Sequence, residues 1–269
     1  MQDILTEQWM IEMIHTATNM YDQGWDERNG GNISVLLPEE DVKDYISGEV
    51  IRTIPLKFDA KEIIGKYFLV TGTGKYFKNV QYDPARNLGL IRIAPNGTDA
   101  ELMWGYSDGG RFTSELPAHL MSHIARLQID PDNRVVMHCH PTNILAMTYV
   151  HTLDERKFTR TLWQMCTECI VVFPDGVNVL PWMLCGTNEI GEATAEKMKT
   201  ARMVVWAQHG IYGAGRDLDE TFGLIETAEK AAEIFMLTAH LPIINTISDA
   251  QMHKLEEHFG VKGREGYLD

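Results

Sequence analysis

Apolar residues recur along the chain at two spacings, and each spacing predicts one kind of element. Near the start, helical spacing predicts an opening helix that Thr6 caps and Gly24 ends. The buried face of this helix consists of Trp9, Met10, Met13, Ile14, Ala17 and Met20. Short runs of β-branched and aromatic residues predict strands at residues 32–37, 67–71, 88–93, 100–104, 134–137, 169–173, 177–183 and 203–207.

Further helical spacing predicts a helix that begins at Thr113–Ser114, with Pro117 in its first turn. The other predicted helices cover residues 142–150, 157–166, 187–199, 218–239 and 248–260. Pro95-Asn-Gly97 is typical of a hairpin turn, and the polar stretch 38–49 predicts a loop. Strands and helices mix without strict βα alternation. This order predicts an α/β fold with a central mixed sheet that helices cover on both faces.

Composition limits the classes of function. The chain has 269 residues, 44% of them hydrophobic, with no secretory segment and no twenty-residue apolar span, so we expect a soluble, cytoplasmic protein. Its four cysteines do not predict a disulfide framework, and Cys166-Thr-Glu-Cys169 is interpreted as packing. A net charge of −14 argues against nucleic acid and anionic membranes as partners. A phosphate ligand would need local positive potential from a metal or from backbone amides.

His138-Cys139-His140 ends a predicted strand, and His209-Gly210 follows another. Side chains alternate along a strand, so His138 and His140 share one face and Cys139 lies on the other. Together with His209 they would form a three-ligand zinc site with one open position, the pattern of catalytic zinc. A His-x-His pair at a strand end is about equally often a hydrogen-bonding pair. The helix after Pro141 disfavours a cupin, and the absence of His-Glu-x-x-His disfavours a thermolysin-type protease.

Six other histidines are interpreted as surface or hydrogen-bonded core residues. They are His15, His123, His151, His240, His253 and His258.

Three polar segments could bind an anion. Arg28-Asn29-Gly30-Gly31-Asn32 and Thr71-Gly72-Thr73-Gly74-Lys75 offer amides and hydroxyls, but neither is a Walker A motif, and each alone is more often a plain turn. Thr113-Ser114-Glu115 is either a helix cap or a phosphate-binding helix start with Glu115 as a base. A helix N-terminus lowers the pKa of a carboxyl group and burial raises it, and the sequence leaves open which effect is larger.

These segments together resemble a known family. Asn29-Gly30-Gly31-Asn32, Val70-Thr-Gly-Thr-Gly-Lys75, Thr113-Ser-Glu-Leu-Pro-Ala-His119, His138-Cys-His140 and His209-Gly210 resemble the zinc-dependent class II aldolases of deoxysugar phosphates. The flanking strings resemble the members that act on L-rhamnulose 1-phosphate. These strings are Gly24-Trp-Asp-Glu-Arg-Asn29, Val172-Phe-Pro-Asp-Gly-Val177, Leu180-Pro-Trp-Met183 and Asp219-Glu-Thr-Phe-Gly-Leu224. The resemblance extends from Gln8 to about Val261, although Thr73 and Pro141 stand where the family pattern has Ser and Ala.

The resemblance implies one class II aldolase domain over residues 1–269, with three α/β/α layers and a largely antiparallel sheet. It implies a homotetramer with active sites at subunit interfaces and one zinc ion per subunit. The implied reaction is reversible cleavage of L-rhamnulose 1-phosphate to dihydroxyacetone phosphate and L-lactaldehyde through a zinc-stabilised enediolate. By position, His138, His140 and His209 match the zinc ligands.

The resemblance also assigns roles around the metal. Glu115 matches the acid/base, and Glu168 matches a residue that acts at the aldehyde end from a neighbouring subunit. The matches to the phosphate-binding loops are Asn29, Asn32, Thr73, Gly74, Thr113 and Ser114.

Three other functions remain open from the sequence. A relative acting on fuculose or ribulose phosphate, as an aldolase or a 4-epimerase, would share these residues. A zinc hydrolase would need a base that activates water. A non-enzymatic domain such as the adducin head has the same fold, but the intact histidines and Glu115 count against it.

Overall fold

The structure is a computed structural model that describes residues 3–269. Within that range, nine strands form one sheet in the order β2-β5-β4-β3-β1-β6-β9-β8-β7. The strands are β1 (Asn32–Leu37), β2 (Arg52–Pro55), β3 (Tyr67–Thr71), β4 (Leu88–Ile93), β5 (Asp99–Gly105), β6 (Val135–Cys139), β7 (Val177–Leu180), β8 (Met203–Trp206) and β9 (Gly210–Gly215). Of the neighbouring pairs in this described sheet, β7 and β8 are parallel and the others antiparallel. The predicted mixed, largely antiparallel sheet is confirmed.

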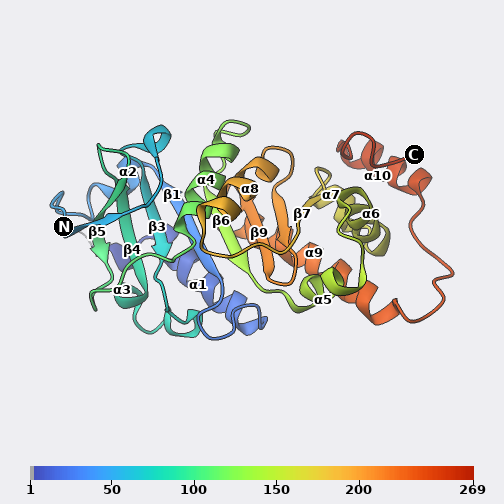
Figure 1. Ribbon diagram of the computed structural model, residues 1–269, viewed down its shortest axis with the longest axis horizontal. Helices are drawn as coiled ribbons and strands as arrows, with labels where there is room; N and C mark the ends of the chain where they lie inside the picture. Colours follow the sequence, from blue (N-terminus) through green and yellow to red (C-terminus); the bar gives the residue numbers. More distant parts are fainter. Residues whose placement is uncertain (1–2) are drawn as a thin grey trace.

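Helices cover both faces of the sheet, as Figure 1 shows. The longer ones are α1 (Gln8–Asp22), α4 (Leu116–Leu127), α5 (Thr142–Val150), α6 (Glu155–Met165), α8 (Asn188–Met198), α9 (Leu218–Thr238) and α10 (Asp249–Phe259). The shorter ones are η1 (Ile4–Thr6), α2 (Glu39–Val42), η2 (Lys61–Ile63), η3 (Phe77–Asn79), α3 (Pro84–Asn87) and α7 (Glu168–Val172). Helices α1 and α9 pack on the face that carries Met137 and Cys139, whereas α4 and α8 pack on the face of Val136. The predicted three α/β/α layers are therefore confirmed.

Residues 169–173 were predicted as a strand, but residues 169–172 belong to helix α7 and Phe173 is its C-cap residue, so that prediction is wrong. The run Cys169-Ile-Val-Val-Phe173 is β-branched, but Cys169 and Ile170 are buried in the cluster that α6 and α9 share. The Trp163 indole donates to the Phe173 carbonyl at 3.2 Å, which holds the end of α7 against α6. Tertiary packing has overridden local propensity here.

Strand β9 was not predicted, because three of its six residues are glycine, a residue that weakens strands. The structure explains this composition. A Cβ atom on Gly210 would lie 2.3 Å from the Cys139 carbonyl oxygen, so β9 can approach β6 this closely only with glycine at that position. The edge strand β2 was also missed, within the polar region that follows β1.

Three of the element boundaries that depart from prediction have a clear local cause. Helix α1 begins at Gln8, and the Thr6 hydroxyl donates to the Asp3 carbonyl instead of capping α1. Helix α4 begins at Leu116, after Thr113–Ser114, and Glu115 is its N-cap residue. Strand β7 ends at Leu180, before Pro181, which lacks the amide hydrogen that a strand ladder requires.

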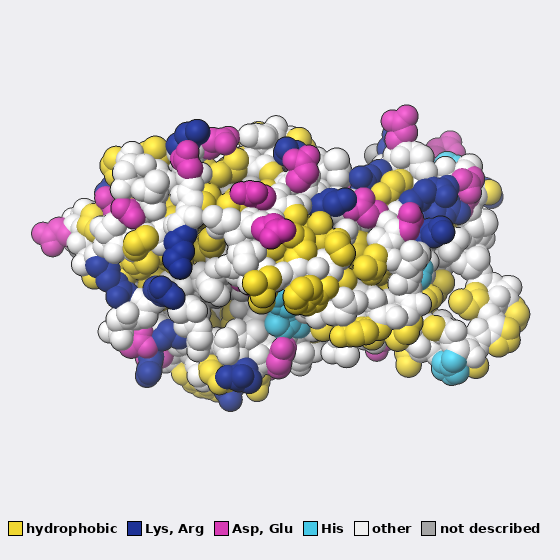
Figure 2. Space-filling view, viewed as in Figure 1, with side chains coloured by type: hydrophobic (Ala, Val, Ile, Leu, Met, Phe, Trp, Pro, Cys, Tyr) yellow, Lys and Arg dark blue, Asp and Glu magenta, His cyan; other side chains and the backbone are white. Residues whose placement is uncertain are grey.

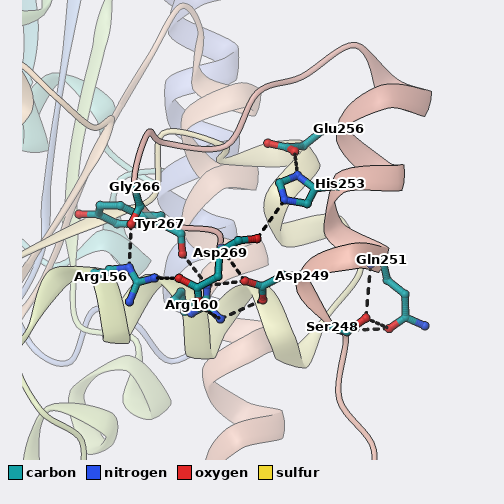
Figure 3. A network of polar contacts seen from close by, with 10 residues as sticks. All are labelled: Arg156, Arg160, Ser248, Asp249, Gln251, His253, Glu256, Gly266, Tyr267 and Asp269. Carbon is teal, nitrogen blue, oxygen red and sulfur yellow. Dashed lines mark hydrogen bonds and ion pairs between the residues drawn. The ribbon is translucent and has the colours of Figure 1, made fainter.

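The C-terminal helix α10 lies beside α6 and α7 at one end of the molecule (Figure 1). A capping box between Ser248 and Gln251 begins this helix, and Gly260 ends it with φ of +66°. Arg160 of α6 donates to both carboxylate oxygens of Asp249, at 2.8 and 2.9 Å (Figure 3). No helix within residues 3–269 is long and apolar enough to cross a membrane.

Candidate metal and active site

Three histidines meet at the ends of inner strands of the sheet. His138 is in β6, His140 follows β6, and His209 lies in the turn between β8 and β9. Strands β6 and β9 are neighbours, with His138 opposite Tyr212, and this pairing brings the β8–β9 turn beside the end of β6. The ring centroids are 5.1 Å apart for His138–His140, 5.0 Å for His138–His209 and 5.1 Å for His140–His209. One ring nitrogen from each lies within 4.8 Å of the others, as a metal site requires.

Two of these imidazoles are fixed in one tautomer by partners that can only accept. His138 Nδ1 is 3.0 Å from the Ile211 carbonyl oxygen, and His140 Nδ1 is 2.9 Å from a Glu27 carboxylate oxygen. Nδ1 therefore carries the proton in both rings, and Nε2 keeps its lone pair. His138 Nε2 is buried without a hydrogen-bond partner among the described residues. A buried unpartnered nitrogen that faces two other imidazoles fits a divalent metal ion.

The electrostatics of the cluster favour neutral imidazoles. Burial, followed by the neighbouring His140 and His209, lowers the pKa of His138 well below its usual value. Burial is also the main cause that lowers the pKa of His209 to about 4. Neutral histidine is the form that binds metal, so near neutral pH His138 and His209 are ready to act as ligands.

Glu115 lies beside the same cluster and is 8% exposed. One carboxylate oxygen is 3.6 Å from His138 Nε2, and the other is 4.0 Å from His209 Nε2. The Asn32 amide donates to Glu115 Oε2 at 2.9 Å, and the Tyr212 hydroxyl donates to the same oxygen at 3.2 Å. Burial raises the pKa of Glu115, and the bonds from Asn32 and Tyr212 only partly oppose this shift. Burial is therefore the largest influence on the pKa of Glu115, larger than the two hydrogen bonds.

A chain of buried polar groups extends from Glu115 into the core. The Asn32 amide nitrogen donates to Glu115, so its oxygen must accept, and His119 Nε2 donates to it. His119 Nδ1 is then an acceptor for the Ser34 hydroxyl at 2.8 Å, and Ser34 accepts from His123 Nε2 at 2.8 Å. Each bond fixes the direction of the next, so this chain fixes which end of the Asn32 side chain faces Glu115.

The six histidines interpreted from the sequence as surface or hydrogen-bonded core residues are found in those places. His123 is buried and hydrogen-bonded, and His151 contacts Thr161 at 3.0 Å. The exposed members are His15, His240, His253 and His258.

A cavity of about 290 Å³ unites the two glycine-rich segments with the cluster. The Thr73 amide donates to the Arg111 carbonyl, and the Thr113 amide donates to the Thr71 carbonyl, both near 3 Å. These bonds hold the second glycine-rich segment beside the start of α4. In the first segment, a Cβ atom on Gly30 would lie 2.9 Å from the His140 ring, so glycine permits this close approach. The candidate anion-binding residues that line the cavity are Asn29, Asn32, Thr73, Gly74, Thr113 and Ser114.

Glu168 is the one candidate that the fold does not bring to this cavity. It is exposed at the start of α7, where its carboxylate accepts from the Cys166 thiol at 2.8 Å. That bond lowers the pKa of Glu168. Its expected action in a neighbouring subunit stays a prediction.

Sequence reasoning missed four residues at this site. Glu27 orients His140, Tyr212 contacts Glu115, and His119 orients Asn32. The Cys185 sulfur lies with Glu115 and His209 in a second group whose ligand atoms are within 4.8 Å of one another. Tyr212 was missed together with its strand. Glu27 and His119 both belong to strings that were singled out, and their spacing from Asn29 and Glu115 was the signal available.

The comparisons with known sequences agree with the resemblance in the motifs. The family described as the class II aldolase and adducin N-terminal domain matches residues 11–236. The rhamnulose-1-phosphate aldolase of Listeria monocytogenes serotype 4b (strain CLIP80459) is 60% identical over 270 residues, covering 100% of this chain and 99% of that protein. The rhamnulose-1-phosphate aldolase of Enterococcus faecalis (strain ATCC 700802 / V583) is 58% identical, covering 99% of this chain and 96% of its own.

Solved structures share the fold. A sugar-phosphate aldolase from Thermotoga maritima has a TM-score of 0.75 and 31% identity, over 86% of this chain and 95% of that chain. An L-fuculose 1-phosphate aldolase, 20% identical, has a TM-score of 0.63 over 95% of this chain and 97% of its own. The chain therefore belongs to the class II aldolase and adducin N-terminal domain family.

Proposed function

We propose that this protein reversibly cleaves L-rhamnulose 1-phosphate to dihydroxyacetone phosphate and L-lactaldehyde. The observation that carries the proposal is the position of Glu115, whose carboxylate lies 3.6 and 4.0 Å from the Nε2 atoms of His138 and His209 in one cavity. Such a carboxylate can move a proton on the carbon next to a metal-activated carbonyl. The relatives named as rhamnulose-1-phosphate aldolases, which match the whole chain, support the choice of substrate.

His138, His140 and His209 would hold one divalent metal ion. Three neutral imidazole nitrogens suit zinc, and cobalt or manganese can occupy such a set. When bound, the metal supplies Lewis-acid stabilisation of negative charge on the substrate oxygens. The Glu27 carboxylate and the Ile211 carbonyl hold two of the rings in the tautomer that offers Nε2. Orientation of this kind typically changes metal affinity by about 10–100-fold.

Glu115 acts as the acid/base in this proposal. Cleavage of the bond between C3 and C4 requires a proton at the carbon that becomes part of dihydroxyacetone phosphate, and the reverse reaction requires its removal. Burial favours the protonated carboxyl group, and the bonds from Asn32 and Tyr212 favour the carboxylate. An acid/base uses both protonation states in turn, and this site has contacts that favour each of them.

The phosphate group would bind at the wall formed by the two glycine-rich segments and the start of α4. Asn29, Asn32, Thr73, Gly74, Thr113 and Ser114 contribute amides and hydroxyls there. Arg28 lines the same cavity and adds a positive charge. The net charge of −14 repels a phosphate dianion. The neutral donors, Arg28 and a divalent metal would together supply the local attraction that overcomes this repulsion.

The remaining proposals concern assembly and location. Residues 1–269 form one class II aldolase domain, and four copies form a cytoplasmic homotetramer. Glu168, exposed on α7, acts at the aldehyde end of a neighbouring site. A fully active monomer in light scattering at assay concentration would contradict this arrangement.

One assay tests the substrate and the metal together. Retro-aldol cleavage of L-rhamnulose 1-phosphate is compared with that of L-fuculose 1-phosphate on one preparation whose metal content is measured. We expect faster cleavage of L-rhamnulose 1-phosphate and close to one metal ion per chain. Faster cleavage of the fuculose compound, or epimerisation of L-ribulose 5-phosphate without cleavage, would overturn the proposed substrate.

A further inference from the structure

Another cavity lies at the opposite ends of the strands that carry the histidines. Its volume is about 630 Å³, against about 290 Å³ for the cavity at the histidines, and the two share no lining residue. Asn133 lines it from the loop before β6, Arg202 from the position before β8, and Gly215 from the end of β9. The length of β6, five residues of roughly 3.3 Å each, therefore separates the two cavities.

Charged side chains form most of the wall of this cavity. They are Arg126, Lys199, Arg202, Arg216, Asp130, Asp175 and Glu220. Arg202 pairs with Asp175 at 2.9 Å and with Glu220 at 3.1 Å. Arg216 pairs with Asp130 at 3.0 Å. The four cations exceed the three carboxylates by one, so the wall is locally positive in a chain whose net charge is −14.

Arg126 of α4 is the cation whose donors are least satisfied. Its side chain is 7% exposed, and it forms no ion pair with a carboxylate among residues 3–269. Nη1 donates to the Met198 carbonyl at the end of α8, at 3.0 Å. The other edge of the guanidinium, formed by Nε and Nη2, has no described acceptor, and Nε is buried. This edge can hold two oxygens of one anion through parallel hydrogen bonds.

Asn133 adds a second unmatched donor to the same wall. It is 1% exposed, and its Nδ2 is buried without a partner in the part of the chain that the structure describes. Burial is the largest cause that lowers the pKa of Arg126, but a guanidinium stays charged in proteins. A buried charge and a buried amide that both lack acceptors cost free energy. Two such groups at one cavity indicate an anionic ligand that supplies the acceptors.

We propose that this cavity binds the phosphate group of a small metabolite, at a site separate from catalysis. Arg126 and Asn133 supply the buried donors, and Lys199, which is half-exposed, supplies charge at the rim. A phosphate monoester carries about −1.5 to −2 charges at pH 7, which suits cations on several sides better than the single charge of a carboxylate does. The volume also leaves room for the organic part of the ligand. The inference is independent of the proposed aldolase reaction, because no residue of the catalytic cavity takes part.

Equilibrium dialysis with radiolabelled inorganic phosphate tests this inference on the full-length protein. Asn133→Asp places a carboxylate in the cavity, where it repels phosphate and offers Arg126 an internal partner. Asn19→Asp adds the same charge on the exposed face of α1 and is the matched control. We expect Asn133→Asp to bind phosphate at this site at least about tenfold more weakly, the loss expected for hydrogen bonds to a charged group. Asn19→Asp should bind phosphate as the wild type does, and both variants should keep cleavage activity.

Equal phosphate binding by the wild type and Asn133→Asp would overturn the inference and leave Arg126 as a support for the end of α8 only. If Asn133→Asp does not fold, acetylation of wild-type lysines decides, followed by mass spectrometry. Phosphate should slow acetylation of Lys199 but not of exposed Lys254, relative to chloride at equal ionic strength. Equal acetylation of Lys199 in phosphate and chloride would then overturn the inference.

Discussion

Two polar networks of this molecule each centre on carboxyl groups but lie in different surroundings. One surrounds Glu115 at the ends of the inner strands, where its partners Asn32 and Tyr212 are buried. The other joins α6 to the C-terminal segment, where Arg160 binds Asp249 and Arg156 binds Asp269 (Figure 3). Figure 2 shows that charged side chains gather over that end of the molecule.

Solvent exposure explains how these networks differ. Burial raises the pKa of Glu115 and lowers those of His138 and His119, so the site favours neutral forms. At the C-terminal network, hydrogen bonds to charged partners dominate; the bond to Arg160 lowers the pKa of Asp249, and the bond to Glu256 raises that of His253. Both of these shifts favour the ionised form.

The two networks therefore have different roles: the Glu115 network belongs to the proposed active site, and the C-terminal network attaches the C-terminal segment to α6. The C-terminal network is composed of complete pairs, whereas the site contains a nitrogen, His138 Nε2, that no described residue satisfies. A buried polar atom without a partner costs free energy, and such atoms persist mainly where a ligand completes them. Variants in the first network should therefore affect activity, and variants in the second should affect only stability.

Loss of a metal ligand should have the largest effect. Replacing His209 by Ala leaves two imidazoles, and we expect the variant to lose its metal and more than about a thousandfold of its activity. That factor corresponds to several kcal/mol of transition-state stabilisation. Metal analysis and the cleavage assay check it, with exposed His258→Ala as the control. Stoichiometric metal and normal turnover in His209→Ala would remove His209 from the site.

The next effect should come from Glu115. Glu115→Gln keeps the size of the side chain but cannot accept a proton near neutral pH. We expect it to fold and hold metal, yet to lose at least about a hundredfold in the exchange of the dihydroxyacetone phosphate α-proton with deuterated water. The Glu115 side chain makes no capping hydrogen bond to α4, so loss of a cap does not explain such a result. Exchange at the wild-type rate in the metal-loaded variant would contradict the acid/base role.

Much of the site was predictable because local spacing encodes it. The two-residue period of a strand places His138 and His140 on one face, and Cys139 is in the opposite core as expected. The glycine-rich segments were less certain from the sequence, since glycine favours turns whether or not a ligand binds. Only the fold shows that both line one cavity.

The missed features depend on contacts distant in sequence. His119 and Asn32 are 87 residues apart, and no spacing rule predicts their bond. Tyr212 lies in β9, whose glycines look unfavourable for a strand until the close approach to β6 is known. Helix α7 shows the opposite error, because a β-branched run became helical through packing against α6 and α9.

The buried chain behind Asn32 should give an intermediate effect. His119→Leu removes the donor that fixes the Asn32 amide, so Glu115 loses its orientation. We expect α-proton exchange and kcat to fall about tenfold, which is about one hydrogen bond's net free energy, with little change in KM. His119→Gln can still donate to Asn32 and should recover part of the rate. A uniform loss of stability with unchanged exchange in both variants would make His119 a structural residue only.

The smallest effect should come from the C-terminal network, and it should leave activity unchanged. Asp249→Asn removes the charge that binds Arg160, and we expect a loss of about 1 kcal/mol in the free energy of unfolding, because the pair is partly solvent-exposed. The pKa of Asp249 is lowered in the folded protein, so its stabilisation is complete above the usual carboxyl pKa near 4 and is lost as pH falls through the lower folded value. Urea unfolding of wild type and variant at neutral and acidic pH should thus give curves that converge in acid. A difference that persists in acid, or a variant with reduced turnover at neutral pH, would contradict the division between the two networks.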